Sequence, residues 1–146
     1  MEYKTVICPV SDPELLDAAV KQASYICKIS GAKLILLNVV EKWYRSADVV
    51  SDSAEWQHIH EEWLNKGREI LEKVRHELKE QGLNKVEVVL REGDAAHEII
   101  AQALENRADL IIMVSHRYSP IGKFFMGGII DKVSKHAPCP VMWVFK

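Results

Sequence analysis

The segment over residues 113–133 holds the side chains best suited to bind an anion. Its sequence, MVSHRYSPIGKFFMGGIIDKV, follows an apolar run and continues into a helical pattern. Arg117 can hold a phosphate through paired hydrogen bonds, and Lys123 adds a second cation to the same loop. Gly127 and Gly128 would leave the amides of the next helix open to an anion at its first turn. Either these groups form a phosphate site, or the loop is a connection whose cations are only solvated.

The common nucleotide-binding motifs do not fit this chain. A dinucleotide fingerprint needs GxGxxG directly after the first strand, where backbone amides approach a pyrophosphate. Here that turn reads VSDP over residues 10–13, and no glycine precedes Gly31. The Walker pattern GxxxxGK[ST] also fails, because Gly122 and Lys123 are followed by Phe124. We therefore expect neither a standard dinucleotide site nor a P-loop.

Candidate catalytic and metal-binding groups give only weak patterns. Ser115 and His116 are adjacent, but neighbouring residues at a strand end point apart, and no GxSxG elbow surrounds the serine. The densest histidine cluster is HIHEE, residues 58–62. His58 and Glu62 would share one helix face, whereas His60 would point away by about 200° around the axis. We interpret these as a polar loop and a solvated helix face, and predict no catalytic group and no metal site.

Short segments rich in β-branched and aliphatic residues are predicted to be strands. Several are apolar on consecutive residues, as in KLILLNVV and ADLIIMV, which is typical of strands buried on both faces of a parallel sheet. Such strands need helices on both sides. The predicted strands cover residues 5–10, 33–40, 85–91, 108–114 and 140–145.

Segments with helical periodicity separate these strands. Residues 12–14, Asp-Pro-Glu, combine a capping acid, a proline at the first helical position and an acid in the first turn, which predicts a helix start. A second helix is predicted over residues 53–81, where Gly67 interrupts the apolar stripe and indicates a close-packing contact. Asp94 would cap a third helix, and a fourth is predicted over residues 127–136. The predicted inward positions of the third helix are Ala96, Ile99, Ile100, Ala103 and Leu104.

This alternation predicts an α/β fold, an open doubly wound parallel sheet between two helical layers, in a single domain over residues 1–146. A chain of 146 residues with 48% hydrophobic positions can bury a core without disulfide or metal support. In such sheets ligands lie outside the carboxyl ends of the strands, where the winding reverses. The loops that follow the strands are therefore the places to look for function.

Charge and cysteine usage limit the partners and the compartment. The 19 basic and 21 acidic side chains are interspersed and leave a formal charge of -2, so we expect no nucleic-acid partner and no membrane surface. Cys8, Cys27 and Cys139 form no CxxC pair and are interpreted as reduced, mostly buried thiols. The first residues show no signal-peptide pattern, and no apolar run is long enough to span a bilayer. A cytoplasmic location is predicted.

The chain resembles the universal stress proteins from end to end. The resemblance rests on the closing segment ADLIIMVSHRYSPIGKFFMGGIIDKVSKHAPCPVMWVF and on the stretch EGDAAHEIIAQA. It implies a Rossmann-like fold of the adenine nucleotide alpha hydrolase type, with a five-stranded parallel sheet. It also implies a cytoplasmic homodimer joined through the last strand, with a regulatory or protective role in stress tolerance. The family has ATP-binding and non-ATP-binding branches.

The ATP-binding branch of this family carries Gly, two residues, Gly, nine residues, Gly, then Ser or Thr. Setting the third glycine at Gly127 places Val114 and Arg117 at the first two positions, and Gly128 where the hydroxyl residue stands. At the first strand, Ser11 takes the place of the acid that contacts adenine, and Asp12 is committed to its helix cap. The resemblance therefore predicts a degenerate ATP site and no turnover. The alternative is an ATP-binding switch or slow ATPase, with Mg²⁺, that uses a rebuilt phosphate loop.

A third option is a pure adaptor whose groove is filled by Trp43, Tyr44 or the second loop, residues 41–52.

Two sets of residues carry the expectations for a ligand and for a dimer. The last strand is almost wholly apolar, and an exposed edge of that kind aggregates unless another strand pairs with it. The candidate ligand site comprises Val10, Ser11, Asp12, Val40, Met113, Val114, Ser115, His116, Arg117, Lys123, Gly127 and Gly128. The candidate dimer strand comprises Val141, Met142, Trp143, Val144 and Phe145.

Overall fold

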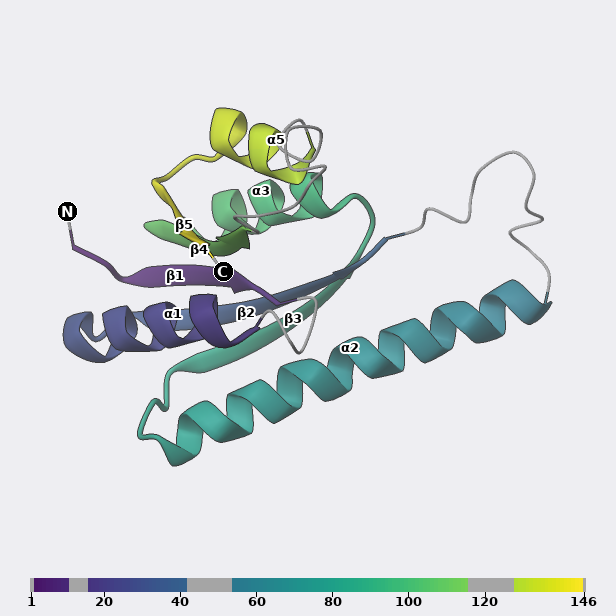
Figure 1. The fold of residues 1–146 in the computed structure, drawn as a ribbon, viewed down its shortest axis with the longest axis horizontal. Coiled ribbons are helices and arrows are strands. Elements are labelled where there is room, and N and C mark those ends of the chain that lie inside the picture. Colours follow the sequence, from purple (N-terminus) through teal and green to yellow (C-terminus); the bar gives the residue numbers. More distant parts are fainter. Residues whose placement is uncertain (1, 11–15, 42–53, 116–127, 146) are drawn as a thin grey trace.

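The computed structural model describes residues 2–10, 16–41, 54–115 and 128–145. They contain a five-stranded parallel sheet with the strand order β3-β2-β1-β4-β5 (Figure 1), which confirms the predicted α/β fold. The strands are β1 (Thr5–Pro9), β2 (Lys33–Val40), β3 (Val86–Glu92), β4 (Leu110–Ser115) and β5 (Val141–Phe145). The limits of β4 differ from the prediction. The strand starts after Asp109, whose carboxylate accepts from the amides of Lys4 and Thr5 at 2.8 and 2.9 Å, and it ends with Ser115 paired to Phe145.

Helices cover both faces of this sheet. The helices α1 (Leu16–Ser30) and α2 (Ala54–Glu80) lie on one face, and α3 (Ala95–Glu105) and α5 (Ile129–His136) lie on the other (Figure 1). This is the predicted three-layer sandwich. The helix start expected at residues 12–14 lies outside the described residues. Within the described ranges, no helix is long and apolar enough to cross a membrane.

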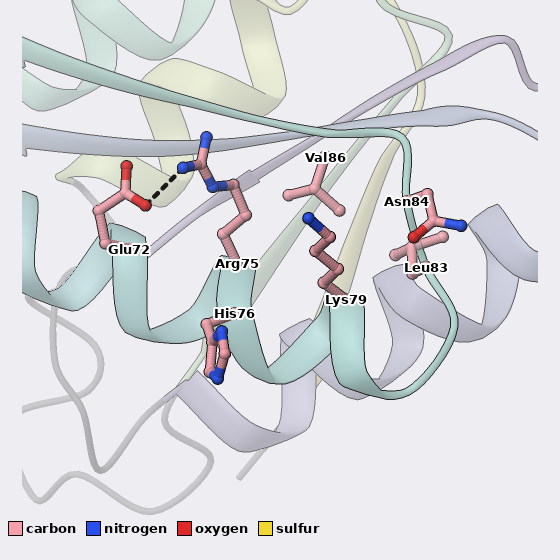
Figure 2. A pocket seen from close by; sticks show the side chains of 7 residues that line it. All are labelled: Glu72, Arg75, His76, Lys79, Leu83, Asn84 and Val86. Atoms are coloured by element: carbon pink, nitrogen blue, oxygen red, sulfur yellow. Dashed lines mark hydrogen bonds and ion pairs between the residues drawn. The ribbon is translucent and has the colours of Figure 1, made fainter.

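The long helix α2 packs on the sheet mainly through its second half. In Figure 1 its first turns reach past the strands, and there Trp56 and Trp63 are only half-buried. Its last turns run beside the start of β3 (Figure 2). The buried residues of α2 are Gly67, Leu71, Val74 and Leu78.

The inward face of α3 differs in part from the predicted one. Ala96, Ile99 and Ala103 are buried as expected, but Leu104 is 61% exposed and Gln102 is only 2% exposed. Gln102 can be buried because its amide has a partner on β3. With the amide oxygen turned toward Arg91, it accepts from the guanidinium Nε at 2.8 Å and from Nη2 at 3.1 Å. The simple apolar pattern could not show this polar contact.

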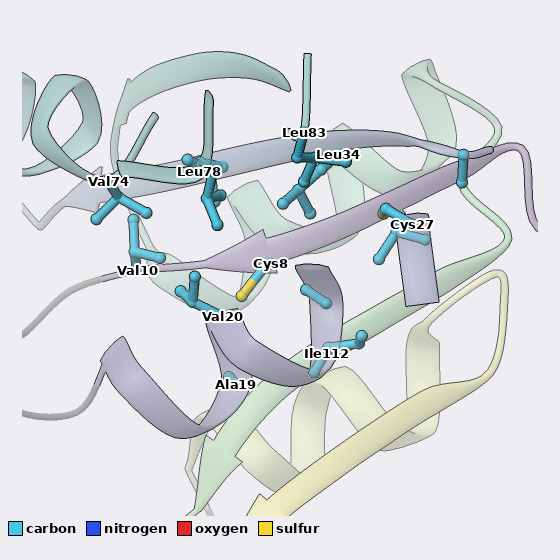
Figure 3. Packing of buried hydrophobic residues seen from close by; sticks show 14 of the residues in the cluster. Cys8, Val10, Ala19, Val20, Cys27, Leu34, Val74, Leu78, Leu83 and Ile112 are labelled. Atoms are coloured by element: carbon cyan, nitrogen blue, oxygen red, sulfur yellow. The ribbon is translucent and has the colours of Figure 1, made fainter. Parts of the chain in front are cut away.

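The core has two parts, one on each face of the sheet. Between the sheet and the α1–α2 layer, Cys8 of β1 and Cys27 of α1 lie among aliphatic side chains (Figure 3). Burial raises the pKa of Cys8 to about 12, with a further contribution from Cys27, and burial raises the pKa of Cys27 to about 11. Both are therefore neutral thiols at physiological pH, as predicted. Cys139 is half-buried and also free.

Candidate functional site

The winding of the sheet reverses between β1 and β4. The chain runs from β1 outward to β2 and β3, and then crosses back to β4 and β5 on the other side of β1. In open α/β sheets, the carboxyl ends of the two strands at such a reversal flank a ligand crevice. The residues at this position are Val10, directly after β1, and Ser115, the last residue of β4. Both belong to the predicted ligand site.

The β1 side of the crevice is held in place by a buried amide. The backbone N–H of Val10 donates to the carbonyl of Leu37 at 2.8 Å. Its own carbonyl accepts from Nδ2 of Asn38 at 2.7 Å, and Asn38 is only 6% exposed. Val40, at the end of β2, is also buried. The end of β1 is thereby fixed to β2 by both main-chain and side-chain hydrogen bonds.

Gly67 of α2 lies directly against the same asparagine. A Cβ added at Gly67 would stand 2.7 Å from Oδ1 of Asn38 and 2.9 Å from Cδ1 of Leu90. Contacts under 3.0 Å cannot form without a shift of the neighbours. This confirms the close-packing contact predicted for Gly67. Sequence reasoning missed Asn38, whose only indication was a polar residue within an otherwise apolar buried strand.

On the β4 side, the predicted residues are divided between the two cores. Met113 is buried in the cluster on the α3–α5 face, and the side chain of Val114 packs against the cluster on the α1–α2 face. Val114 is only half-buried, so part of its side chain stays exposed near the strand end. Ser115, the next residue, is 9% exposed at the strand end.

The start of α5 is open to an anion as far as its described part shows. Gly128 is the N-cap, with φ -95° and ψ -123°, and no side-chain hydrogen bond caps this helix. An acid in the first turn, Asp131, forms an ion pair with Lys135 at 3.2 Å. The other predicted ligand residues lie outside the described ranges: Ser11, Asp12, His116, Arg117, Lys123 and Gly127.

The start of α3, by contrast, is already occupied by carboxylates. Asp94 is the N-cap and accepts from the backbone N–H of His97 at 2.9 Å. Glu41, which follows β2, accepts from the backbone N–H of Ala95 at 3.3 Å. Negative side chains at this helix start satisfy its amides and repel a further anion. A further anion is therefore disfavoured at the start of α3.

The HIHEE cluster is only partly a solvated face. Nε2 of His58 lies 3.1 Å from the carboxylate of Glu62, and both side chains are exposed, as the helical spacing predicts. His60 instead reaches Glu92, with Nε2 2.7 Å from the carboxylate, and its side chain is 15% exposed. It therefore joins α2 to the end of β3. Over the described ranges, no group of three His, Cys, Asp or Glu side chains could hold a metal ion.

The five-stranded parallel sheet between two helical layers defines the class of Rossmann-like α/β proteins. The model of the universal stress protein family matches residues 2–144. Universal stress protein MJ0531 of Methanocaldococcus jannaschii is 31% identical over 146 residues, which is 99% of this chain and 83% of that protein. The chain belongs to the universal stress protein family, and this membership gives it a stress-response role.

Solved structures of the family share the fold. The universal stress protein UspA from Lactobacillus plantarum has a TM-score of 0.84 at 18% identity, with 99% of both chains covered. A universal stress protein in complex with cAMP has a TM-score of 0.69 at 20% identity, covering 99% of this chain and 98% of that one. One from Archaeoglobus fulgidus in complex with dAMP has a TM-score of 0.65 at 15% identity, with 99% of both chains covered.

Proposed function

We propose that this protein is a regulatory or protective homodimer of the cytoplasm that carries out no turnover, with subunits joined through β5. The dimer is inferred from the edge position and the exposure of β5 in a single subunit. It lies at the edge of the sheet, and in the described residues it pairs with β4 alone. Its first residues are half-buried and apolar, and Phe145 at its end is 57% exposed.

The backbone of β5 offers a row of hydrogen-bonding groups to a partner. The amide of Ile111 donates to the carbonyl of Pro140 at 3.0 Å, so residue 140 faces β4. Because facing alternates along a strand, the N–H and C=O groups of Val141, Trp143 and Phe145 point away from β4. A second copy placed across a two-fold axis would supply an antiparallel strand to this row. Such pairing would also cover the apolar side chains of the strand end.

The dimer is tested by removing one outward N–H. Phe145→Pro removes the donor without touching a residue that faces β4. Sedimentation velocity is expected to show a monomer for Phe145→Pro. Phe145→Ala, which shortens the same side chain but keeps the N–H, should retain more dimer. A stable dimer in Phe145→Pro at the wild-type dissociation constant would contradict pairing through β5.

The same proposal holds that the carboxyl edge does not bind ATP in the manner of the family motif. Two of the motif glycines are replaced, by Val114 and Arg117, and the adenine-contacting acid is replaced by Ser11. Acids at the start of α3 add a repulsive charge beside the crevice. A triphosphate, with the highest charge, is the nucleotide most disfavoured by these changes.

A second candidate is an adenine-nucleotide switch that uses Arg117, Lys123 and the start of α5. It is favoured by the uncapped Gly128 and by the relatives of the same fold that were solved with cAMP and dAMP. In this version a single phosphate would lie at the first turn of α5 and the base would lie over the buried ends of β1 and β2. ATP with Mg²⁺ would be its largest ligand.

Calorimetric titration separates the two candidates. The ligands are Mg-ATP, ADP, AMP and cAMP, each taken to millimolar concentration. No heat from any of them supports the first candidate. Heat at micromolar ligand that disappears in Arg117→Ala, but not in the exposed control Arg68→Ala on α2, establishes the second. Heat for AMP or cAMP without heat for ATP would identify the site as one for monophosphates.

A further inference from the structure

A concave site lies at the amino end of β3, away from the carboxyl edge of the sheet. It is a groove of about 360 Å³ between the last turns of α2 and the first residue of β3 (Figure 2). Grooves of this volume are at the lower end of the range for small-molecule sites. Its lining residues are Glu72, Arg75, His76, Lys79, Leu83, Asn84 and Val86.

The groove concentrates positive charge in a chain whose formal charge is -2. Arg75 and Lys79 stand four residues apart on α2, and in Figure 2 both head groups rise on the side of the helix that faces Val86. The single acid in the lining, Glu72, accepts from Nη2 of Arg75 at 2.6 Å. Both side chains of this ion pair are exposed, and exposed ion pairs contribute little to stability. An anionic ligand can therefore compete with Glu72 for the guanidinium.

The floor of the groove is apolar and its wall is fixed. Leu83 is 5% exposed, and Val86 is half-buried at the start of β3. The turn between them and α2 is closed by hydrogen bonds from the amide of Gly82 to the carbonyl of Lys79, at 3.0 Å, and from Leu83 to Leu78, at 2.9 Å. Gly82 adopts φ +92°, which an L side chain rarely does. Asn84 is therefore held at the rim by a well-defined turn.

We propose that this groove binds a phosphate monoester of a small apolar or aromatic body. The phosphoryl group lies between Arg75 and Lys79, because a guanidinium fork and an ammonium together match a dianion. The organic part rests on Leu83 and Val86, and Asn84 forms the rim beyond Lys79 (Figure 2). The groove is independent of the proposed nucleotide edge, since it lies at the amino end of β3, about 20 Å along the strand from the carboxyl end.

The binding is tested by NMR titration of ¹⁵N-labelled protein at low salt with inorganic phosphate, phenyl phosphate and phenol. Both phosphates are expected to shift the amides around Lys79 and Asn84. Phenyl phosphate should bind more tightly than inorganic phosphate, phenol alone should produce no shift, and added salt should weaken both phosphates. Shifts confined to Ser115 and Gly128 would assign the anion to the carboxyl edge and overturn this proposal. So would the absence of shifts at millimolar phosphate.

Matched variants separate a defined site from general charge attraction. Arg75→Ala and Lys79→Gln should each lower the affinity for phenyl phosphate by about fivefold, the effect expected of a partly exposed charged contact. Lys73→Ala removes the same charge from an exposed position of α2 outside the groove and should leave the affinity unchanged. Equal losses in the Lys73 and Lys79 variants would show that only the net charge of the helix matters. That result would also overturn the proposal.

Discussion

Gly67→Ala tests whether α2, Asn38 and the candidate ligand crevice are mechanically linked. The new Cβ would stand 2.7 Å from Oδ1 of Asn38, an atom that cannot move freely because the same amide donates to the carbonyl of Val10 at 2.7 Å. Cδ1 of Leu90, at 2.9 Å, must shift as well. Either α2 lifts from the sheet, or Asn38 turns and leaves the carbonyl of Val10 without its side-chain donor.

The expected magnitude is a balance of opposing terms. Alanine gains about 1 kcal/mol over glycine in helix propensity. Overpacking costs about 1–3 kcal/mol, and loss of a buried hydrogen bond costs about 1–3 kcal/mol. Gly67→Ala should therefore lower the free energy of unfolding by about 1 kcal/mol, because either cost on its own, at about 2 kcal/mol, outweighs the gain in propensity.

Urea denaturation measures this change, with the slope of the transition expected to stay constant. The propensity term is measured separately by comparing Lys66→Ala with Lys66→Gly at the neighbouring exposed position. In an Asn38→Ala background, the closest clash is absent and Gly67→Ala should be much less harmful, which a double-mutant cycle reports as coupling. A Gly67→Ala protein more stable than wild type, by the amount found at Lys66, would refute the reasoning.

Further predictions concern the buried thiols, the β1–β4 link and the α3 cap. The free energy of unfolding should fall as pH rises from 9 toward 11, by roughly 1 kcal/mol per pH unit for each buried thiol. The cause is that burial raises the folded pKa of Cys8 to about 12 and that of Cys27 to about 11, so only the unfolded thiols ionise in that window. Cys8→Ala should reduce the fall, and Cys8→Ala combined with Cys27→Ala should flatten it, as urea titrations across pH would show. Asp109→Ala should cost about 2 kcal/mol by urea denaturation, because its carboxylate accepts from the amides of Lys4 and Thr5. Asp94→Ala should cost about 1 kcal/mol in thermal unfolding; no change would show that its cap contributes nothing.

The parts of the fold that follow local rules could be predicted from the sequence. Consecutive apolar residues in KLILLNVV indicated a strand buried on both faces, and Leu34 and Ile35, which point to opposite faces, are indeed fully buried. Asp94 stands before an apolar periodic run, and it caps α3 as expected. These successes have one cause, since capping and binary patterning depend on residues close in sequence.

The sequence-based predictions failed where a buried polar side chain has a hydrogen-bond partner far away in the sequence. The partner of Asn38 is a carbonyl 28 residues earlier in the chain, and nothing in the strand's own pattern specifies it. Gln102 takes an inward place on α3, and Leu104 is left exposed, because Arg91 on β3 satisfies the amide. A hydrophobic pattern counts only the transfer of side chains from water. It cannot include a buried hydrogen bond whose second member is unknown.

The charges at the carboxyl edge predict how an anionic ligand would be oriented there, even though the family's glycine motif is incomplete. Asp94 and Glu41 place two carboxylates at the start of α3. The start of α5 has Gly128 without a side-chain cap in its described part, and its one first-turn acid, Asp131, is paired with Lys135. An anionic ligand in the crevice would therefore direct its charged group toward α5 and its neutral part toward the buried ends of β1 and β2. A neutral ligand would experience no such bias. Replacing Glu41 with Gln should consequently strengthen the binding of anions at this edge and leave neutral nucleosides unaffected.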